Sequence, residues 1–241
     1  MTNKLYIVAT PIGNLEDITL RALRVLKEVD LIFAEDTRVA KKLLAHFGIG
    51  TPIAKRHTRD EQKAAEEIIV ELEVGKNIAL ISDAGTPGIS DPGAFIVQKV
   101  REWGKKVQPF SRSKVEPFIK IEAVPGPSAL AAAISVAGVP ANEFLFLGFL
   151  PHKKGRETLF KEIAVSERVV IFYESPHRIL RTLESLKKFA PEKKITICRE
   201  LTKIYEEVIT GTATELLEFF EKHPEKVRGE FVVLVNITSR I

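Results

Sequence analysis

The sequence has very few residues of the types that form covalent cross-links or bind soft metals. Its 241 residues include one cysteine, one methionine and one tryptophan. A single cysteine excludes an internal disulfide and any zinc site built from cysteines. We expect that residue, Cys198, to lie in a strand as a small apolar side chain. The five histidines show no metal-ligand spacing, so no metal site is predicted.

Three common cofactor and catalytic motifs are missing as well. No G-x-G-x-x-G follows the first apolar segment, which argues against a Rossmann-type dinucleotide site. No G-x-x-x-x-G-K-[ST] is present, which excludes a phosphate-binding P-loop. The G-x-S-x-G turn that carries a nucleophilic serine is also absent. A small-molecule site in this protein must therefore be built from several unrelated loops.

Long hydrophobic runs and a strong charge imbalance are absent too. No run is long enough to span a bilayer, and the apolar segment Leu5–Ala9 is too short for a signal sequence. We therefore expect a cytoplasmic protein without a membrane partner. The net charge is only +4, with a pI near 9.0, which is compatible with a polyanionic partner but does not establish one.

The most informative stretch that is present runs from residue 78 to residue 93. It begins with four apolar residues, Ile78–Ile81, as a buried parallel strand does. A long loop rich in Gly, Pro, Ser and Asp follows, and it carries the carboxylates of Asp83 and Asp91. Loops that leave the carboxyl ends of parallel strands are where open α/β sheets bind ligands. This loop is therefore the first candidate for a binding site.

The rest of the first half alternates strand and helix patterns. Strands are predicted at Leu5–Ala9, Leu31–Ala34 and Pro52–Ala54, and the helix after Pro92 is predicted to end at Gly104. The alternation indicates a mostly parallel sheet with helices on both faces. Polar loops would then meet at one edge of that sheet: residues 10–14, 35–38, 55–59 and 82–93.

The second half follows a different pattern, in which some strands are joined by helices and others by short turns. A helix is predicted from Pro176 to Phe189, and a mixed sheet is expected. The Pro-rich turn at residues 125–128 predicts a boundary between an α/β domain of residues 1–125 and another of residues 126–241. Residues 107–120, basic and rich in Ser and Pro, do not fit either pattern. Two interpretations stay open for them, a solvated surface loop or hairpin and an arm that touches nucleic acid.

Several motifs, in order along the chain, resemble one known family. They are Thr10–Asn14, Ala34–Arg38, Ser82–Pro87, Pro125–Ala129, Gly148–Pro151, Phe172–Arg178, Arg199–Lys203 and Gly229–Glu230. Together they resemble the tetrapyrrole methylase superfamily, and within it the 2′-O-methyltransferases of small-subunit ribosomal RNA. Members of that family usually pass through a single short strand between the helix predicted to end at Gly104 and the Pro-Gly-Pro motif, so residues 107–120 resemble an insertion.

The resemblance implies a fold, a cofactor and partners. The fold would be the two-domain α/β fold of the superfamily, and the cofactor S-adenosyl-L-methionine. The partners would be 16S rRNA in the small ribosomal subunit and a second copy of the chain in a homodimer. The reaction would methylate the ribose 2′-hydroxyl of a cytidine. Two alternatives stay open, a methylase of a small tetrapyrrole and a non-catalytic RNA-binding assembly factor.

The resemblance also implies roles for individual residues. Cofactor contacts would come from Pro11, Gly13, Asp83, Ala84, Gly85, Thr86, Pro87, Ser128, Tyr173, Glu174 and Leu201. A hydroxyl is a weak nucleophile and needs a base or a stabilising cation. The candidates placed around it are Glu35, Asp36, Arg38, Glu174, Arg199, Glu200 and Lys203. Some of these candidates, such as Arg199 and Glu200, could instead form salt bridges at a domain interface. Predicted RNA contacts are Arg56, Arg59, Lys153, Lys154, Arg156 and Arg178, and the alternative for such basic residues is a solvated basic surface.

Overall fold

The computed structural model describes residues 3–56, 60–91, 93–107 and 119–236. The chain divides into two compact units, Met1–Ser128 and Ala129–Ile241, each with its own sheet. The division falls at the end of the Pro-rich turn. No helix among the described residues is long and apolar enough to cross a membrane.

Unit 1 is a five-stranded parallel sheet in the order β3-β2-β4-β1-β5. Its strands are β1 (Asn3–Val8), β2 (Leu31–Ala34), β3 (Ile53–Lys55), β4 (Ile78–Ile81) and β5 (Ile119–Val124). Its helices are η1 (Leu15–Asp17), α1 (Leu20–Glu28), α2 (Thr37–His46), α3 (Glu61–Glu73) and α4 (Gly93–Val107). The predicted parallel sheet is confirmed.

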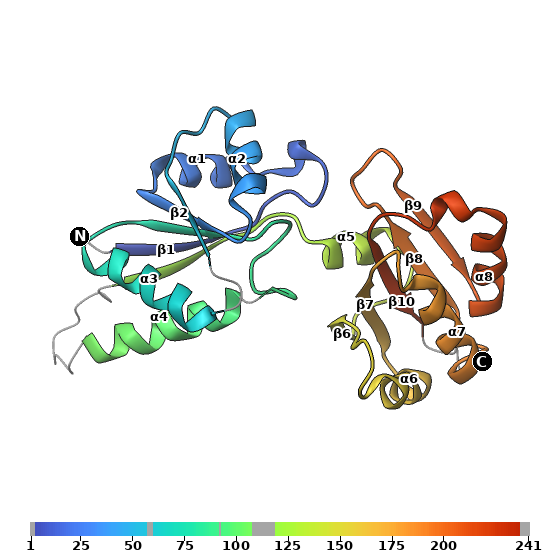
Figure 1. The fold of residues 1–241 in the computed structure, drawn as a ribbon. Helices are drawn as coiled ribbons and strands as arrows, with labels where there is room; N and C mark the ends of the chain where they lie inside the picture. Colours follow the sequence, from blue (N-terminus) through green and yellow to red (C-terminus); the bar gives the residue numbers. More distant parts are fainter. Residues whose placement is uncertain (1–2, 57–59, 92, 108–118, 237–241) are drawn as a thin grey trace. The chain divides into compact units, whose positions relative to one another are not determined.

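Helices cover both faces of this sheet, with α1 and α2 on one side and α3 and α4 on the other (Figure 1). The central strand β4 shows why its sequence is apolar throughout. Ile78 and Leu80 join the core under α3 and α4, whereas Ala79 and Ile81 join the core under α1 and α2. All four side chains are therefore removed from water, which fixes β4 at the centre of the unit.

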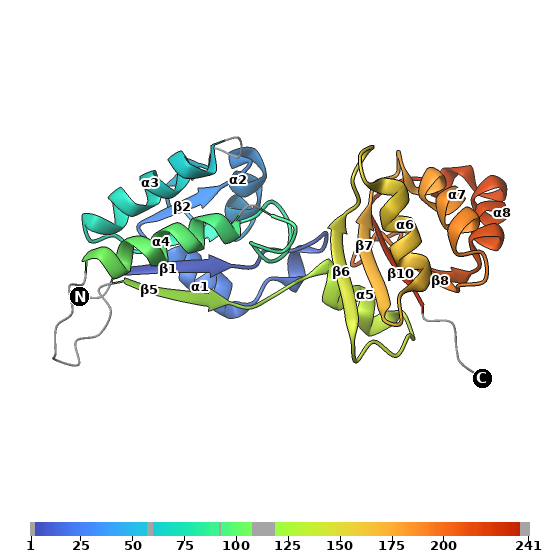
Figure 2. The ribbon, with the colours of Figure 1, turned by 90° about the horizontal axis from the view of Figure 1, so that it is seen from below.

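Unit 2 is a five-stranded mixed sheet in the order β6-β7-β10-β8-β9, as expected from the sequence. Its strands are β6 (Phe144–Phe149), β7 (Val169–Glu174), β8 (Ile195–Arg199), β9 (Glu207–Gly211) and β10 (Phe231–Val235). Among the described strands of this unit, only the β6–β7 pair is parallel. The helices are α5 (Ala129–Val136), α6 (Arg156–Val165), α7 (Ile179–Phe189), α8 (Ala213–Lys222) and η2 (Pro224–Lys226). Figure 2 shows α6, α7 and α8 together on one side of the sheet and α5 on the other.

Two predicted helix boundaries are wrong. Helix α4 continues through Gly104 to Val107, because one helical glycine costs only about 1 kcal/mol relative to alanine and the basic residues Lys105 and Lys106 suit a helix C-terminus. Helix α7 begins at Ile179, not at Pro176. Pro176 lies in a turn in which the Ser175 carbonyl accepts hydrogen bonds from the Arg178 and Ile179 amides. Most of the segment predicted to be inserted, residues 108–118, lies outside the described residues.

Candidate functional site

The turns that leave β1, β4 and β5 are joined directly at the carboxyl edge of the unit 1 sheet. Thr10 and Gly85 exchange two backbone hydrogen bonds, of 2.9 and 3.0 Å. The Thr86 hydroxyl donates to the carbonyl of Pro127 at 3.0 Å. Residues from three distant stretches of sequence therefore form one continuous surface, at the edge where parallel sheets bind ligands.

Gly85 is the residue that makes this junction possible. Its φ is +78°, a conformation that residues with a side chain rarely adopt. A Cβ atom there would lie 3.3 Å from the side chain of Ile12 and 3.6 Å from the Pro127 carbonyl oxygen. The hydroxyl of Ser82 also donates to the Gly85 carbonyl, at 3.0 Å. The glycine thus lets the backbones approach closely while the loop stays rigid.

The other predicted cofactor contacts of unit 1 lie along the same turns. Pro11 and Pro87 are buried, Ser128 and Thr86 are half-buried, and Gly13, Asp83 and Ala84 are exposed. One oxygen of Asp83 accepts a hydrogen bond from the Asp36 amide at 2.9 Å, which links the loop after β4 to the loop after β2. These positions agree with a binding surface, and their contacts with a cofactor stay a prediction.

Asp36 caps helix α2 and pairs with Arg38. Its carboxylate accepts from the Arg38 amide at 2.8 Å and from the Arg38 guanidinium at 2.6 Å. The hydrogen bonds from the Arg38 side chain and backbone hold the pKa of Asp36 far below its ordinary range. Such a carboxylate is a weak base, so the geometry favours a structural role for Asp36 over proton transfer.

Glu35, Arg56 and Asp91 form a second cluster at this edge. Arg56 is 1% exposed, and its Nη2 atom lies 2.7 Å from Glu35 Oε2 and 3.0 Å from Asp91 Oδ2. Burial raises the pKa of Glu35, and the neighbouring charges of Asp83 and Asp91 add to the rise against the lowering effect of Arg56. Because the guanidinium of Arg56 is enclosed by protein, its predicted contact with RNA does not fit the structure.

Unit 2 contains a buried ionic network centred on Glu174, the last residue of β7. Its Oε1 atom accepts from the Ser175 amide at 2.9 Å and pairs with Arg178 Nε at 2.7 Å. Its Oε2 atom accepts from the Thr182 hydroxyl at 2.7 Å. Arg156 donates to the same hydroxyl at 2.7 Å, and its charge lies 4.0 Å from Glu174. The Glu174 carboxylate, predicted as a catalytic and cofactor-binding group, is thus occupied by contacts within its own unit.

The two arginines of this network hold the turn that precedes α6. Arg178 donates to the Leu150 carbonyl at 2.8 Å, and Arg156 donates to the Pro151 carbonyl at 3.1 Å. Both guanidinium groups therefore point into the protein, which does not fit the predicted phosphate contacts. In contrast, Lys153 and Lys154 in the same turn are exposed, and neither forms an ion pair with another described residue. Arg59 lies outside the described residues.

The Arg199–Lys203 motif forms a tight loop after β8. Glu200 and Thr202 have positive φ values of 51° and 67°, which are strained for residues with side chains. Lys203 pairs with Glu200 at 2.8 Å and with Glu230 at 2.9 Å. Burial alone would raise the pKa of Glu200, but the hydrogen bonds from Lys203 and the Glu230 amide outweigh it and lower that pKa.

The remaining predicted residues of unit 2 are partly enclosed. Arg199 is 9% exposed, and its Nε atom lies 3.5 Å from Glu207. Leu201 is buried, and the ring of Tyr173 lies edge-on to those of Phe146 and Phe149, with centroids 5.0 and 5.4 Å apart. Their predicted roles in catalysis or cofactor binding stay predictions.

Two residues without a predicted role complete these clusters: Thr182, which the sequence did not single out, and Asp91, which it placed in the candidate loop. Thr182 bridges Glu174 and Arg156, and Asp91 pairs with Arg56. A hydroxyl on the apolar face of α7 is a signal that could have identified Thr182, because a buried hydroxyl needs a partner.

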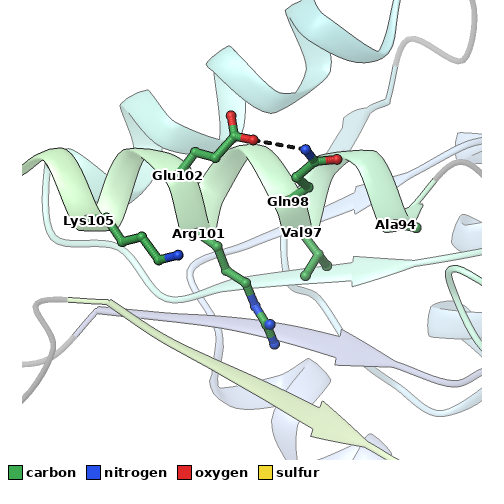
Figure 3. A pocket seen from close by; sticks show the side chains of 6 residues that line it. All are labelled: Ala94, Val97, Gln98, Arg101, Glu102 and Lys105. Atoms are coloured by element: carbon green, nitrogen blue, oxygen red, sulfur yellow. Dashed lines mark hydrogen bonds between the residues drawn. The ribbon is translucent and has the colours of Figure 1, made fainter.

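A surface hollow of about 380 Å³ lies beside α4, away from the residues predicted for function. Figure 3 shows the six residues that line it on one face of the helix: Ala94, Val97, Gln98, Arg101, Glu102 and Lys105. Gln98 donates a hydrogen bond to Glu102 at 2.9 Å along this helix (Figure 3). None of these described lining residues belongs to the turns at the sheet edge, to the cluster of Glu35, Arg56 and Asp91, or to the network around Glu174. The hollow is therefore not part of the candidate site.

The fold and the sheet edge define a class of protein, an α/β protein with a loop-built ligand site in unit 1 and a second, mixed-sheet unit. Comparison with known proteins gives the family. The sequence model of one protein family, the tetrapyrrole (corrin/porphyrin) methylases, matches residues 4–217 of this chain. The chain belongs to this family, and the superfamily resemblance of the motifs is confirmed.

Individual relatives cover almost the whole chain. It is similar to a protein of Thermotoga maritima named ribosomal RNA small subunit methyltransferase I, with 42% identity over 97% of this chain and 98% of that protein. A protein of the same name from Escherichia coli O157:H7 is 45% identical over 97% of this chain and 77% of that protein. The structure of uroporphyrin-III C-methyltransferase from Thermus thermophilus, complexed with S-adenosyl homocysteine, has a TM-score of 0.63 at 17% identity, covering 97% of each chain. That structural likeness confirms the fold.

Proposed function

We propose that this protein uses S-adenosylmethionine to methylate the 2′-hydroxyl of a cytidine ribose in the 16S rRNA of the small ribosomal subunit. The observation that carries the proposal is the identity of 42% and 45% to two proteins named ribosomal RNA small subunit methyltransferase I, along nearly the whole chain. The same relatives favour ribosomal RNA over a small tetrapyrrole as the substrate. The ribose hydroxyl and the cytidine rest on the motif resemblance.

The charges at the sheet edge of unit 1 fit this cofactor, which carries a positive sulfonium and an ammonium group. Four carboxylates, those of Glu35, Asp36, Asp83 and Asp91, lie there with two guanidinium groups, those of Arg38 and Arg56. The Asp83 carboxylate is exposed and forms no ion pair with another described residue, so its negative charge can attract a cation. Gly85 permits the close approach of backbone groups that could bind the adenine and ribose. When bound, the cofactor supplies an activated methyl group.

The protein has to align the hydroxyl with that methyl group and to remove the hydroxyl proton. Alignment alone supplies much of the acceleration in such displacements. A carboxylate at the sheet edge of unit 1 would accept the hydroxyl proton, and exposed cations would bind the phosphates of the RNA. Lys153 and Lys154 are suitable, since both are exposed on a turn held by the buried Arg156 and the half-buried Arg178.

The proposal includes a homodimer. Strand β6 is an edge of the unit 2 sheet and exposes three large apolar side chains, Phe144, Leu145 and Phe149, at 40%, 47% and 58%. An exposed apolar edge of this kind is typical of an interface. Light scattering after gel filtration should give twice the chain mass for the wild type. A Leu145→Glu variant that keeps the same doubled mass would exclude this edge from the interface.

The test of the function is methyl transfer from labelled S-adenosylmethionine. Three substrates are compared: assembled small subunits, naked 16S rRNA and a tetrapyrrole precursor. Label on one cytidine ribose, at a position that becomes resistant to alkaline cleavage, is the expected result. Label on the tetrapyrrole alone would refute the proposal. Binding of RNA without binding of S-adenosylmethionine in calorimetry would indicate a non-catalytic assembly factor instead.

A further inference from the structure

Arg56 occupies an unusual position for a charged residue. It follows β3, and its amide donates to the Ala34 carbonyl at 2.7 Å, which extends the pairing of β3 with β2. Its side chain is 1% exposed, among the largest buried side chains of the described residues. Burial of a guanidinium is unfavourable unless its partners compensate for lost water. The groups that pair with the Arg56 guanidinium therefore indicate the role of this residue.

One nitrogen of Arg56 makes both ion pairs. The Nη2 atom reaches Glu35, directly after β2, at 2.7 Å and Asp91, in the loop after β4, at 3.0 Å. The second oxygen of Asp91 accepts from the Gly93 amide at 2.7 Å and so fixes the start of α4. A single positive charge thus links the carboxyl ends of β2, β3 and β4, where the candidate site lies.

The buried ion pairs of Arg56 are not explained by a gain in the stability of the fold. The Nε and Nη1 atoms of Arg56 are buried and have no hydrogen-bond partner among the described residues. Unpaired buried donors are unfavourable, and apolar side chains often replace buried ion pairs without loss of stability. Arg56 holds the carboxylates of Glu35 and Asp91 although two of its own nitrogens lack a described partner. Its presence is better explained by the fixed positions that it gives to these two carboxylates.

Glu35 is the carboxylate left with a free oxygen. Its Oε2 atom is held by Arg56, and no described residue donates a hydrogen bond to its Oε1 atom. Its side chain is 36% exposed, so a substrate can reach this residue. Asp36 is engaged by Arg38, and Asp91 by Gly93 and Arg56. Glu35 is thus the best candidate among these three for a proton acceptor.

We propose that Arg56 is a positioning residue that holds Glu35 so that its Oε1 atom accepts the proton of the attacking ribose hydroxyl. The proposal rests on the methyl transfer proposed above. The ribose O–H bond breaks while the oxygen bonds to the methyl carbon. The carbon–sulfur bond breaks at the same time, leaving S-adenosylhomocysteine, and the proton goes to Glu35. Burial raises the pKa of Glu35, so its carboxylate is a stronger base than an ordinary glutamate.

The experiment compares five variants with the wild type in single-turnover transfer to small subunits, across pH. Glu35→Gln should lower the rate by about a hundredfold or more, because the base is lost. Arg56→Met should lower it by roughly ten- to a hundredfold through misplacement of Glu35. Arg56→Lys should recover most of the rate, since one ammonium can replace the one nitrogen that makes both pairs. Arg24→Met is the control, because Arg24 forms an exposed pair with Glu28.

The pH profile separates positioning from a general loss of structure. The charged groups around Glu35 are Arg56, Asp83 and Asp91. Removal of the only cation among them should move the acid limb of the Arg56→Met profile to higher pH. S-adenosylmethionine affinity, measured by calorimetry, should stay within about threefold of wild type, a change worth well under 1.4 kcal/mol.

Three results would overturn the proposal. They are full activity of Glu35→Gln, an unchanged acid limb in Arg56→Met, and an Arg56→Lys variant no better than Arg56→Met. An Arg56→Met/Glu35→Gln double variant should be no slower than Glu35→Gln alone, because both changes act on one group. A wild type that transfers no methyl group would instead refute the proposed function, and this proposal with it.

Discussion

Removal of the Glu174 carboxylate should strongly destabilise unit 2. In a Glu174→Ala variant, Arg178 loses its partner at 2.7 Å and the Thr182 hydroxyl loses its acceptor at 2.7 Å. The side chains of Arg156 and Arg178 are only 9% and 15% exposed, so both charges stay largely buried without a counter-ion. Breaking a buried ion pair from one side costs about 3–5 kcal/mol. We expect a loss of that size in the free energy of unfolding.

Urea unfolding followed by circular dichroism measures this loss. The control is Glu143→Ala, because Glu143 pairs with Arg168 at 3.0 Å on the surface, with both side chains more than half exposed. Exposed pairs contribute about 1 kcal/mol or less, so the control should unfold close to the wild type. A Glu174→Ala variant within about 1 kcal/mol of its control would show that Glu174 does not hold the two arginines.

Three further predictions concern other parts of the chain. Burial raises the pKa of Cys198 from 9.0 to about 11, so the free energy of unfolding should fall as pH rises between those values, and a Cys198→Ala variant should lack that part of the fall. Gly229 has a φ of +83°, and a Cβ there would overlap the Glu200 side chain. Gly229→Ala should therefore lower the thermal midpoint, and an unchanged midpoint would show that this position tolerates a side chain. Replacement of Lys153 and Lys154 by alanine should make the plot of log affinity for rRNA against log salt concentration less steep, by roughly one to two in the magnitude of its slope. Filter binding measures this slope, and an unchanged slope would exclude phosphate contacts by these two lysines.

The sequence predicted the sheet of unit 1 well because local pattern and long-range packing agree there. The run Ile78–Ile81 is apolar at every position, and the structure buries it on both faces. The polar loops after the strands therefore had to meet at one edge. Helix ends were less predictable. At Gly104 a residue of low helix propensity is outweighed by its surroundings, whereas Pro176, which would suit the first turn of a helix, lies in the turn before α7.

The roles of the arginines could not be predicted from sequence. Arg56 stands among basic residues and resembles a surface cation, yet its partners lie 21 and 35 residues away in the chain. Arg156 likewise follows two lysines but donates to Thr182, 26 residues further on. Whether a cation faces water or a buried carboxylate depends on tertiary contacts that no local pattern encodes.

The strand order of unit 2 has a consequence for how the protein is made. Strand β10 is the last strand of the unit in sequence, but it lies at the centre of the sheet, between β7 and β8. During synthesis, β7 and β8 leave the ribosome before the strand that joins them, and each has an open edge until β10 follows. Open edges are templates for aggregation. Unit 2 is therefore most prone to aggregate before Phe231–Val235 has been added to the sheet. A chain that is truncated before this strand should accumulate as aggregates.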